Sequence, residues 1–161
     1  MPSHSEKYAA SRLRHQESKL LLAKFKETKD FPLDHFQIDA CKALESGNSV
    51  LVAAPTGSGK TVVGEFAIFL SQNQNGKAFY TTPIKALSNQ KFNELTEIYG
   101  EEKVGLLTGD VSINGEAPIV VMTTEVLRNM LYVQSSTLNH LQHVIMDEVH
   151  YLADRSRGAV W

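Results

Sequence analysis

The sequence lacks the features that mark several large classes of protein. Its single cysteine, Cys41, excludes an internal disulfide framework. No apolar run approaches the length that a membrane-spanning helix needs. The first 16 residues have no apolar stretch behind their charges, so they do not resemble a secretory signal. These absences predict a cytoplasmic protein with no membrane segment.

An excess of positive charge is also missing. The formal net charge is −2, so composition alone does not indicate binding to DNA or RNA. Hydrophobic residues make up 42% and charged residues 21% of the 161 residues, which is ordinary for a globular chain with one packed core. A function must therefore be argued from motifs.

The chain has a polar first part and a longer second part in which apolar runs alternate with amphipathic stretches. Residues 1–30 predict a helical N-terminal extension, and residues 31–161 predict an α/β domain. Its expected strands are SVLVA, KAFYTT, KVGLL, PIVVMT and HVIMD, and its expected helices are 34–45, 60–70, 85–99 and 125–132. Such alternation predicts a mainly parallel sheet with helices on both faces and ligands at the carboxyl ends of the strands.

The strongest motif follows the first of these expected strands. A loop leads from residues 50–53 into a predicted helix, which is the context that a phosphate-binding loop requires. Glycines let backbone N–H groups surround an anion, Lys60 would reach the β- and γ-phosphates, and the Thr61 hydroxyl would bind Mg²⁺. The alternative is a plain glycine-rich turn. The loop residues are Ala54, Pro55, Thr56, Gly57, Ser58, Gly59, Lys60 and Thr61.

Two adjacent carboxylates end the last expected strand. A phosphate loop that holds Mg²⁺ needs an anionic partner at the end of a neighbouring apolar strand, and Asp147 after HVIM has that position. Glu148 would sit beside the metal and accept a proton from the water that attacks the γ-phosphate. The alternative for this pair is a helix N-cap with an acidic first turn.

Six segments together resemble one family. PTGSGKT and DEVH are similar to the first and second motifs of DExH-box helicases of superfamily two. TTPIKALSNQKF, GLLTGDVSIN, MTTEVLRNML and DRSRGAVW resemble the superkiller-type, exosome-associated RNA helicases of that group, in order from residue 31 to residue 161. The resemblance implies a RecA-like P-loop NTPase fold, the cofactors ATP and Mg²⁺, and an ATP-dependent RNA helicase that translocates on and unwinds nucleic acid.

The resemblance also implies roles for single residues in nucleotide binding. Phe31 and Gln37 match the motif that recognises adenine, and an amide with a nearby aromatic ring suits the edge and face of that base. In the alternative, Phe31 is a hydrophobic staple and Gln37 is merely solvated. His150 would face the cleft between two lobes and relay the nucleotide state to the nucleic acid.

Other matched residues are expected to contact a single strand of nucleic acid. Hydroxyl and N–H groups at loop ends and helix N-termini bind phosphate oxygens without reading sequence. Taken singly, each threonine could instead be a helix cap, and Glu125 is better explained as a carboxylate that stabilises its own helix N-terminus. The expected contacts are Pro83, Lys85, Asn89, Gln90, Thr108, Gly109, Thr123 and Thr124.

The motifs that such helicases carry after DEVH are absent from the 161 residues, so we expect the incomplete first of two lobes, truncated after the DEVH motif. A second RecA-like lobe in cis and an RNA-degradation complex are the expected partners. Three other functions remain open. They are a DNA translocase or helicase, a small P-loop phosphotransferase, and a nucleotide-binding or partner-docking module that does not turn over.

Overall fold

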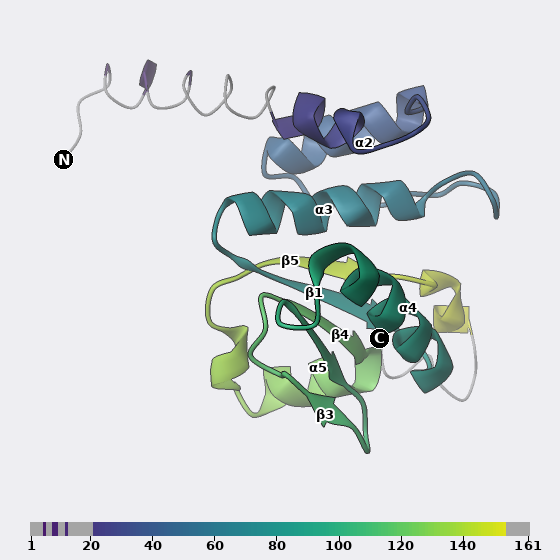
Figure 1. Cartoon of the computed structure of the whole chain (residues 1–161), viewed down its shortest axis with the longest axis vertical. Helices are drawn as coiled ribbons and strands as arrows, with labels where there is room; N and C mark the ends of the chain where they lie inside the picture. The colour runs from purple at the N-terminus through teal and green to yellow at the C-terminus, as the bar shows by residue number, and fades with distance from the viewer. Residues whose placement is uncertain (1–4, 6–7, 10–11, 13–20, 154–161) are drawn as a thin grey trace. The chain divides into compact units, whose positions relative to one another are not determined.

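A computed structural model describes residues 5, 8, 9, 12 and 21–153 of the chain (Figure 1). The chain divides into two compact units, Met1–Leu70 and Ser71–Trp161. Most of the predicted N-terminal extension lies outside the described residues, although residues 21–27 are helical. The segment DRSRGAVW also lies outside them.

The first unit has a helical core. Helix α2 (His35–Glu45) begins with a capping box, in which the Asp34 and Gln37 side chains each accept a hydrogen bond from the other residue's backbone N–H. The aromatic ring of Phe25 packs against that of Phe66 in α3 (Thr61–Asn73), with 5.0 Å between centroids. Cys41 is completely buried in this cluster, and burial raises the pKa of its thiol to about 12. The only cysteine is therefore a packing residue, because its thiol stays protonated.

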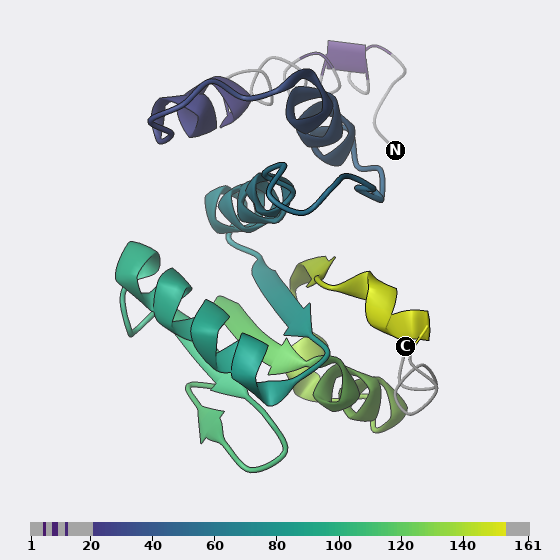
Figure 2. The same ribbon diagram turned by 90° about the vertical axis from the view of Figure 1, so that its right-hand side faces the viewer.

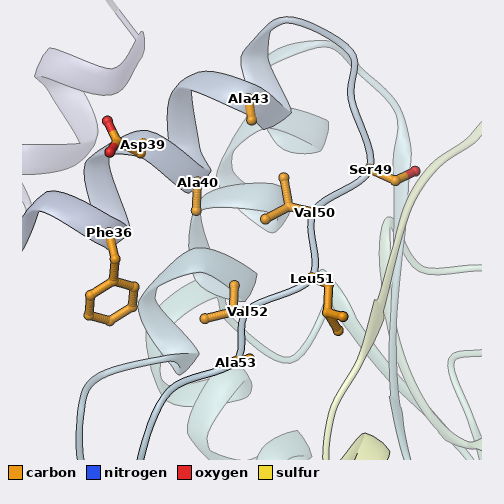
Figure 3. Close-up of a pocket in the computed structure, with 9 residues that line it drawn as sticks. All are labelled: Phe36, Asp39, Ala40, Ala43, Ser49, Val50, Leu51, Val52 and Ala53. Carbon is orange, nitrogen blue, oxygen red and sulfur yellow. The ribbon is translucent and has the colours of Figure 1, made fainter.

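The segment before the glycine-rich loop differs from the prediction. Residues 48–55 form no strand, so the expected strand at 50–53 is wrong. The side chain of Leu51 is 82% exposed, and Figure 3 shows it pointing away from Val50 and Val52, which point toward the α2 residues that line the same cavity. A strand is stable only where a neighbouring chain pairs with its backbone, and apolar composition does not supply that neighbour.

The second unit is built on a five-stranded sheet with the order β3-β2-β4-β1-β5. Strands β2, β4, β1 and β5 run parallel, and only β3 is antiparallel to its neighbour β2. The strands are β1 (Lys77–Thr82), β2 (Val104–Leu107), β3 (Ser112–Ile113), β4 (Ile119–Thr123) and β5 (Leu141–Met146). The predicted mainly parallel sheet is confirmed, and four of its strands lie where the sequence places them.

Helices cover the sheet on both faces, as predicted. On one face, Phe79 and Met122 pack with Leu127 of α5 (Thr124–Tyr132). On the other face, the Thr82 hydroxyl lies 2.7 Å from the hydroxyl of Ser88 in α4 (Lys85–Tyr99). Figure 2 shows the strands between these two helices. Alternation along β1 therefore sends neighbouring side chains into two separate layers.

Three short elements were not predicted. They are β3 and the 3₁₀ helices η1 (Ser136–Leu138) and η2 (Val149–Ala153). None is long enough to show a repeating apolar pattern, so the sequence gives no periodic signal for them. Among the described residues, no helix is both long and apolar enough to span a membrane.

Candidate nucleotide and nucleic-acid site

The glycine-rich loop of the first unit is a hydrogen-bonded turn that is followed by exposed residues. Both the backbone N–H and the hydroxyl of Ser58 donate to the carbonyl oxygen of Pro55, at 3.2 and 2.6 Å. Gly57 and Gly59 have φ values of +82° and +80°, a conformation that other residues rarely adopt. Lys60 and Thr61 are exposed at the start of α3, so their amine and hydroxyl groups are available to an anion and a metal.

The amide of Gln37 joins the start of α2 to this loop. Its Nε2 donates to the carbonyl oxygen of Gly59 at 2.9 Å, and its Oε1 accepts from the backbone N–H of Asp34 at 2.8 Å. The residue is 3% exposed, so the alternative of a merely solvated side chain is wrong. Phe31 is 51% exposed. The amide retains one N–H for a further acceptor.

Hydrogen bonds fix both carboxylate oxygens of Asp147 in the second unit. Parallel pairing with β1 positions the residue, because its backbone N–H donates to the carbonyl oxygen of Thr81 at 3.0 Å. Its Oδ1 accepts from the backbone N–H of Glu148 at 2.9 Å. Its Oδ2 accepts from the Tyr80 hydroxyl at 2.7 Å. The contact with Tyr80 was not anticipated. It follows from the register, because Tyr80 pairs with Ile145, and Asp147 lies two residues after Ile145 on the same side of the chain.

Glu148 has an unusual backbone conformation beside this carboxylate. Its φ is +56°, a region that costs about 1–3 kcal/mol for a residue other than glycine and that concentrates at functional sites. Its carboxylate Oε2 lies 3.1 Å from Nδ1 of His150, which is exposed. The following helix η2 has no acidic residue in its first turn, so the alternative of an acidic first turn is not met.

A cavity of about 460 Å³ lies at the carboxyl ends of β1, β2 and β4. These strands are adjacent and parallel, so the loops that follow them meet at one edge of the sheet. Five of the eight expected nucleic-acid contacts line this cavity, and Glu125 from the first turn of α5 lies among them. The five contacts are Pro83, Lys85, Thr108, Gly109 and Thr123.

An acidic residue that the sequence did not single out lies against the basic group of this cavity. The Lys85 Nζ donates to Oδ2 of Asp110 at 2.5 Å, and the Thr108 hydroxyl donates to Oδ1 at 3.1 Å. The hydrogen bond from Lys85 is the largest cause that holds the pKa of Asp110 below its usual value. The Asp110 carboxylate thus forms an ion pair with Lys85, which is the interaction that a phosphate of a nucleic acid would make.

The three other expected contacts do not line the cavity. Gln90 is exposed and donates to Glu94 of its own helix at 3.1 Å, and Asn89 is half-buried. Thr124 is 4% exposed, and its hydroxyl donates to the carbonyl oxygen of Thr82 at 3.2 Å. The Thr124 hydroxyl is therefore used in joining α5 to the sheet.

The oxygen atoms that the chain offers suit a magnesium ion that is also bound by phosphate oxygens of a nucleotide. Among the described residues, no three His, Cys, Asp or Glu side chains come together as a metal site. Mg²⁺ is usually held by one or two carboxylates together with phosphate oxygens and water, and not by a cage made only of protein. In the second unit, Asp147 and Glu148 provide two partly exposed carboxylates of that kind, and in the first unit Thr61 provides an exposed hydroxyl.

Comparisons of this chain with known proteins match it to helicases. Residues 34–161 match the family model described as DEAD/DEAH box helicase. The chain is 64% identical over 140 residues to the probable helicase HelY of Mycobacterium leprae, covering 87% of this chain and 15% of the relative. It is 51% identical over 131 residues to the antiviral helicase SKI2 of Saccharomyces cerevisiae, covering 81% and 10%.

Solved structures have the same fold. The chain superposes on the Mycobacterium smegmatis helicase Lhr, bound to single-stranded DNA and AMP-PNP, with a TM-score of 0.65 and 30% identity. That match covers 87% of this chain and 21% of the solved one. A helicase named MrfA, bound to DNA and AMPPNP, matches with a TM-score of 0.65 and 26% identity.

Proposed function

Because this chain belongs to the DEAD/DEAH box helicase family, we propose that it is the nucleotide-binding lobe of an ATP-dependent RNA helicase. Its fold is the RecA-like helicase fold that the sequence predicted. The similarity to SKI2 agrees with the predicted resemblance to superkiller-type DExH helicases. The chain spans only 10–15% of these two relatives, so the activity of a whole helicase is part of the proposal.

In this proposal the exposed loop residues bind the triphosphate. Lys60 would hold the β- and γ-phosphates, and the backbone N–H groups between Pro55 and Thr61 would surround the phosphate oxygens. Bound Mg²⁺ would neutralise the charge that develops on the phosphates. Asp147 and the Thr61 hydroxyl would bind that ion, and Glu148 would accept the proton of the attacking water.

Gln37 and Phe31 would recognise the base. The remaining N–H of the Gln37 amide suits a ring nitrogen acceptor on adenine, and the exposed ring of Phe31 suits the face of the base. Because the same amide already contacts Gly59, base and phosphate recognition would be linked through one side chain. A higher affinity for ADP than for GDP tests this assignment, and equal affinities would remove Gln37 from it.

The RNA strand would bind across the cavity at the carboxyl edge of the sheet. The observation that carries the proposal is that segments 83–86, 108–109 and 123–125, at the ends of three different strands, line this one cavity. Helices α4 and α5 begin at this edge, and no side chain caps the N-terminus of either helix. Their first-turn N–H groups can therefore bind phosphate oxygens, which explains how a chain of net negative charge would bind nucleic acid.

DNA is the second candidate substrate, because the similar helicases Lhr and MrfA were solved with DNA. We favour RNA because SKI2 and a DExH-box RNA helicase of Arabidopsis thaliana, at 54% identity, are more similar in sequence than those DNA-bound proteins. Similarity to the mouse superkiller complex protein 2 supports work within an RNA-degradation complex. Unwinding would also need a second RecA-like lobe, which we do not assign to any of the 161 residues.

The test measures nucleotide binding and turnover separately on the 161-residue chain. Lys60→Ala should weaken the affinity for a fluorescent ATP analogue by about tenfold or more, because it removes a charge-assisted hydrogen bond. Glu148→Gln should keep that affinity, because glutamine preserves the shape of the glutamate side chain and removes only its ability to accept a proton. Glu97→Gln, which changes an exposed carboxylate of α4, is the matched control.

ATP hydrolysis should be near background in the unmodified chain and in all three variants. Binding of single-stranded RNA should weaken steeply as the salt concentration rises. An arginine finger from a second lobe is worth roughly a thousandfold or more in related sites. Robust RNA-stimulated hydrolysis by the chain would contradict the assignment of a lobe that binds without turning over. Unchanged affinity in Lys60→Ala would contradict the nucleotide site itself.

A further inference from the structure

The Tyr80 side chain lies in the middle of β1 and reaches the end of β5. The residue is 2% exposed. Its Cα pairs with Ile145 of β5, and Asp147 follows two positions later, directly after the strand ends at Met146. Diagonal neighbours of this kind on adjacent strands are within reach of an aromatic side chain. The register of the sheet therefore brings the phenol hydroxyl to Oδ2 of Asp147, at 2.7 Å.

A second contact of Tyr80 involves its aromatic ring. The Nζ of Lys91 in α4 lies 5.3 Å from the centroid of the Tyr80 ring, in the position of a cation–π contact. Lys91 also pairs with Glu94 on its own helix at 2.5 Å, and its side chain is 15% exposed. The ring therefore contacts α4, and its hydroxyl donates to Asp147.

We propose that Tyr80 is a positioning residue that holds the Asp147 carboxylate in the orientation needed to bind the metal of a metal–nucleotide complex. The inference rests on the proposed function, because it takes Asp147 as a metal ligand. With Oδ1 bonded to the Glu148 N–H and Oδ2 to the Tyr80 hydroxyl, the carboxylate is fixed before a metal arrives. Each oxygen keeps lone-pair capacity for a metal.

The size of the effect follows from the behaviour of groups that orient metal ligands. Removing a hydrogen-bond partner of a ligating side chain typically costs 10–100-fold in metal affinity or activity. Tyr80→Phe removes one oxygen atom and keeps the ring between β1 and α4. It should therefore lower metal affinity and leave metal-free nucleotide binding intact, because the proposal has the phenol act only through the Asp147 carboxylate.

The experiment measures Mn²⁺ binding to the 161-residue chain by electron paramagnetic resonance, at saturating ADP. Tyr80→Phe should weaken the Mn²⁺ affinity by about tenfold or more. Its ADP affinity in EDTA should equal that of the unmodified chain. Tyr132→Phe is the matched control, because Tyr132 is 79% exposed on α5 and should change neither quantity.

Asp147→Asn and the double variant separate positioning from general damage. If the hydroxyl acts through the carboxylate, Tyr80→Phe should have no further effect on Mn²⁺ affinity once Asp147 is Asn. An effect that persists in that background would overturn the proposal, as would wild-type Mn²⁺ affinity in Tyr80→Phe. Unchanged Mn²⁺ affinity in Asp147→Asn would instead refute the proposed function. The double-variant comparison also decides the matter if Tyr80→Phe lowers the melting temperature.

Discussion

The two units differ in what holds their functional segment in place. In the second unit, backbone pairing with β1 places Asp147 at the end of β5. In the first unit, no strand precedes the glycine-rich loop, and one side-chain hydrogen bond, from Gln37 to Gly59, joins it to α2. In a sheet, many backbone hydrogen bonds between strands fix the position of a residue, whereas the position of a loop depends on one or two contacts. Single substitutions should therefore affect the loop more than the sheet edge.

Gly59→Ala should have the largest effect of the substitutions that test this difference. A Cβ atom would lie 2.5 Å from Nε2 of Gln37, and the φ of +80° is itself strained for alanine. The strain costs roughly 1–2 kcal/mol, and the broken hydrogen bond adds about 1 kcal/mol. Hydrogen exchange should show reduced protection in α2 and α3, while the amides of the sheet keep theirs.

Two other glycines are the controls. Gly57 has a φ of +82° and open space around it, so Gly57→Ala should show only the strain. Gly109 in the second unit has open space and no such φ, so Gly109→Ala should stay within about 0.5 kcal/mol. Equal losses in Gly59→Ala and Gly57→Ala would mean that the contact with Gln37 contributes nothing to the loop.

The same contrast explains how far sequence could predict the structure. Helix α4 begins and ends where the apolar pattern places it, and the glycine-rich turn comes from local composition. The expected strand at 50–53 was wrong because strand formation depends on a partner elsewhere in the chain. The contacts of Tyr80 with Asp147 and of Lys85 with Asp110 were missed for a related reason. They depend on sheet register and loop geometry, which no local pattern encodes.

Ion pairs offer a second way to compare the units. The side chains of Lys29 and Glu65 in the first unit are 18% and 27% exposed, whereas those of Lys85 and Asp110 are 48% and 65% exposed. Exposed pairs add little to stability. Asp110→Asn should therefore leave the melting temperature nearly unchanged but free Lys85 for a phosphate, and raise affinity for single-stranded RNA by up to about fivefold.

Fluorescence anisotropy with a labelled oligonucleotide measures this gain, which should shrink as salt is added. Asp39→Asn is the control, because it makes the same change of charge at an exposed position of α2 in the first unit. Equal gains in Asp110→Asn and Asp39→Asn would show that net charge alone sets the affinity. They would then give Asp110 no role at the cavity.

The smallest effect is expected from protonation of His143 on β5. Burial lowers the pKa of this imidazole from its ordinary value of 6.5, and its Nδ1 lies 2.7 Å from the Ser71 hydroxyl. The folded chain thus binds the proton less readily than the unfolded chain. The stability that the neutral ring contributes is fully present above pH 6.5 and is lost as the pH falls through the lower folded pKa.

Melting temperatures measured from about pH 7.5 to about pH 5.5 should isolate this contribution, because His143→Gln removes the titrating group and keeps a side chain that can hydrogen-bond. The unmodified chain should lose more stability over this range than His143→Gln. His35→Gln, at an exposed position of α2 in the first unit, should lose as much as the unmodified chain. If His143→Gln and the unmodified chain lose the same amount, the ring does not link pH to the stability of the sheet. The sheet edge would then tolerate protonation at this strand, because its many ladder bonds hold β5 in place without the imidazole.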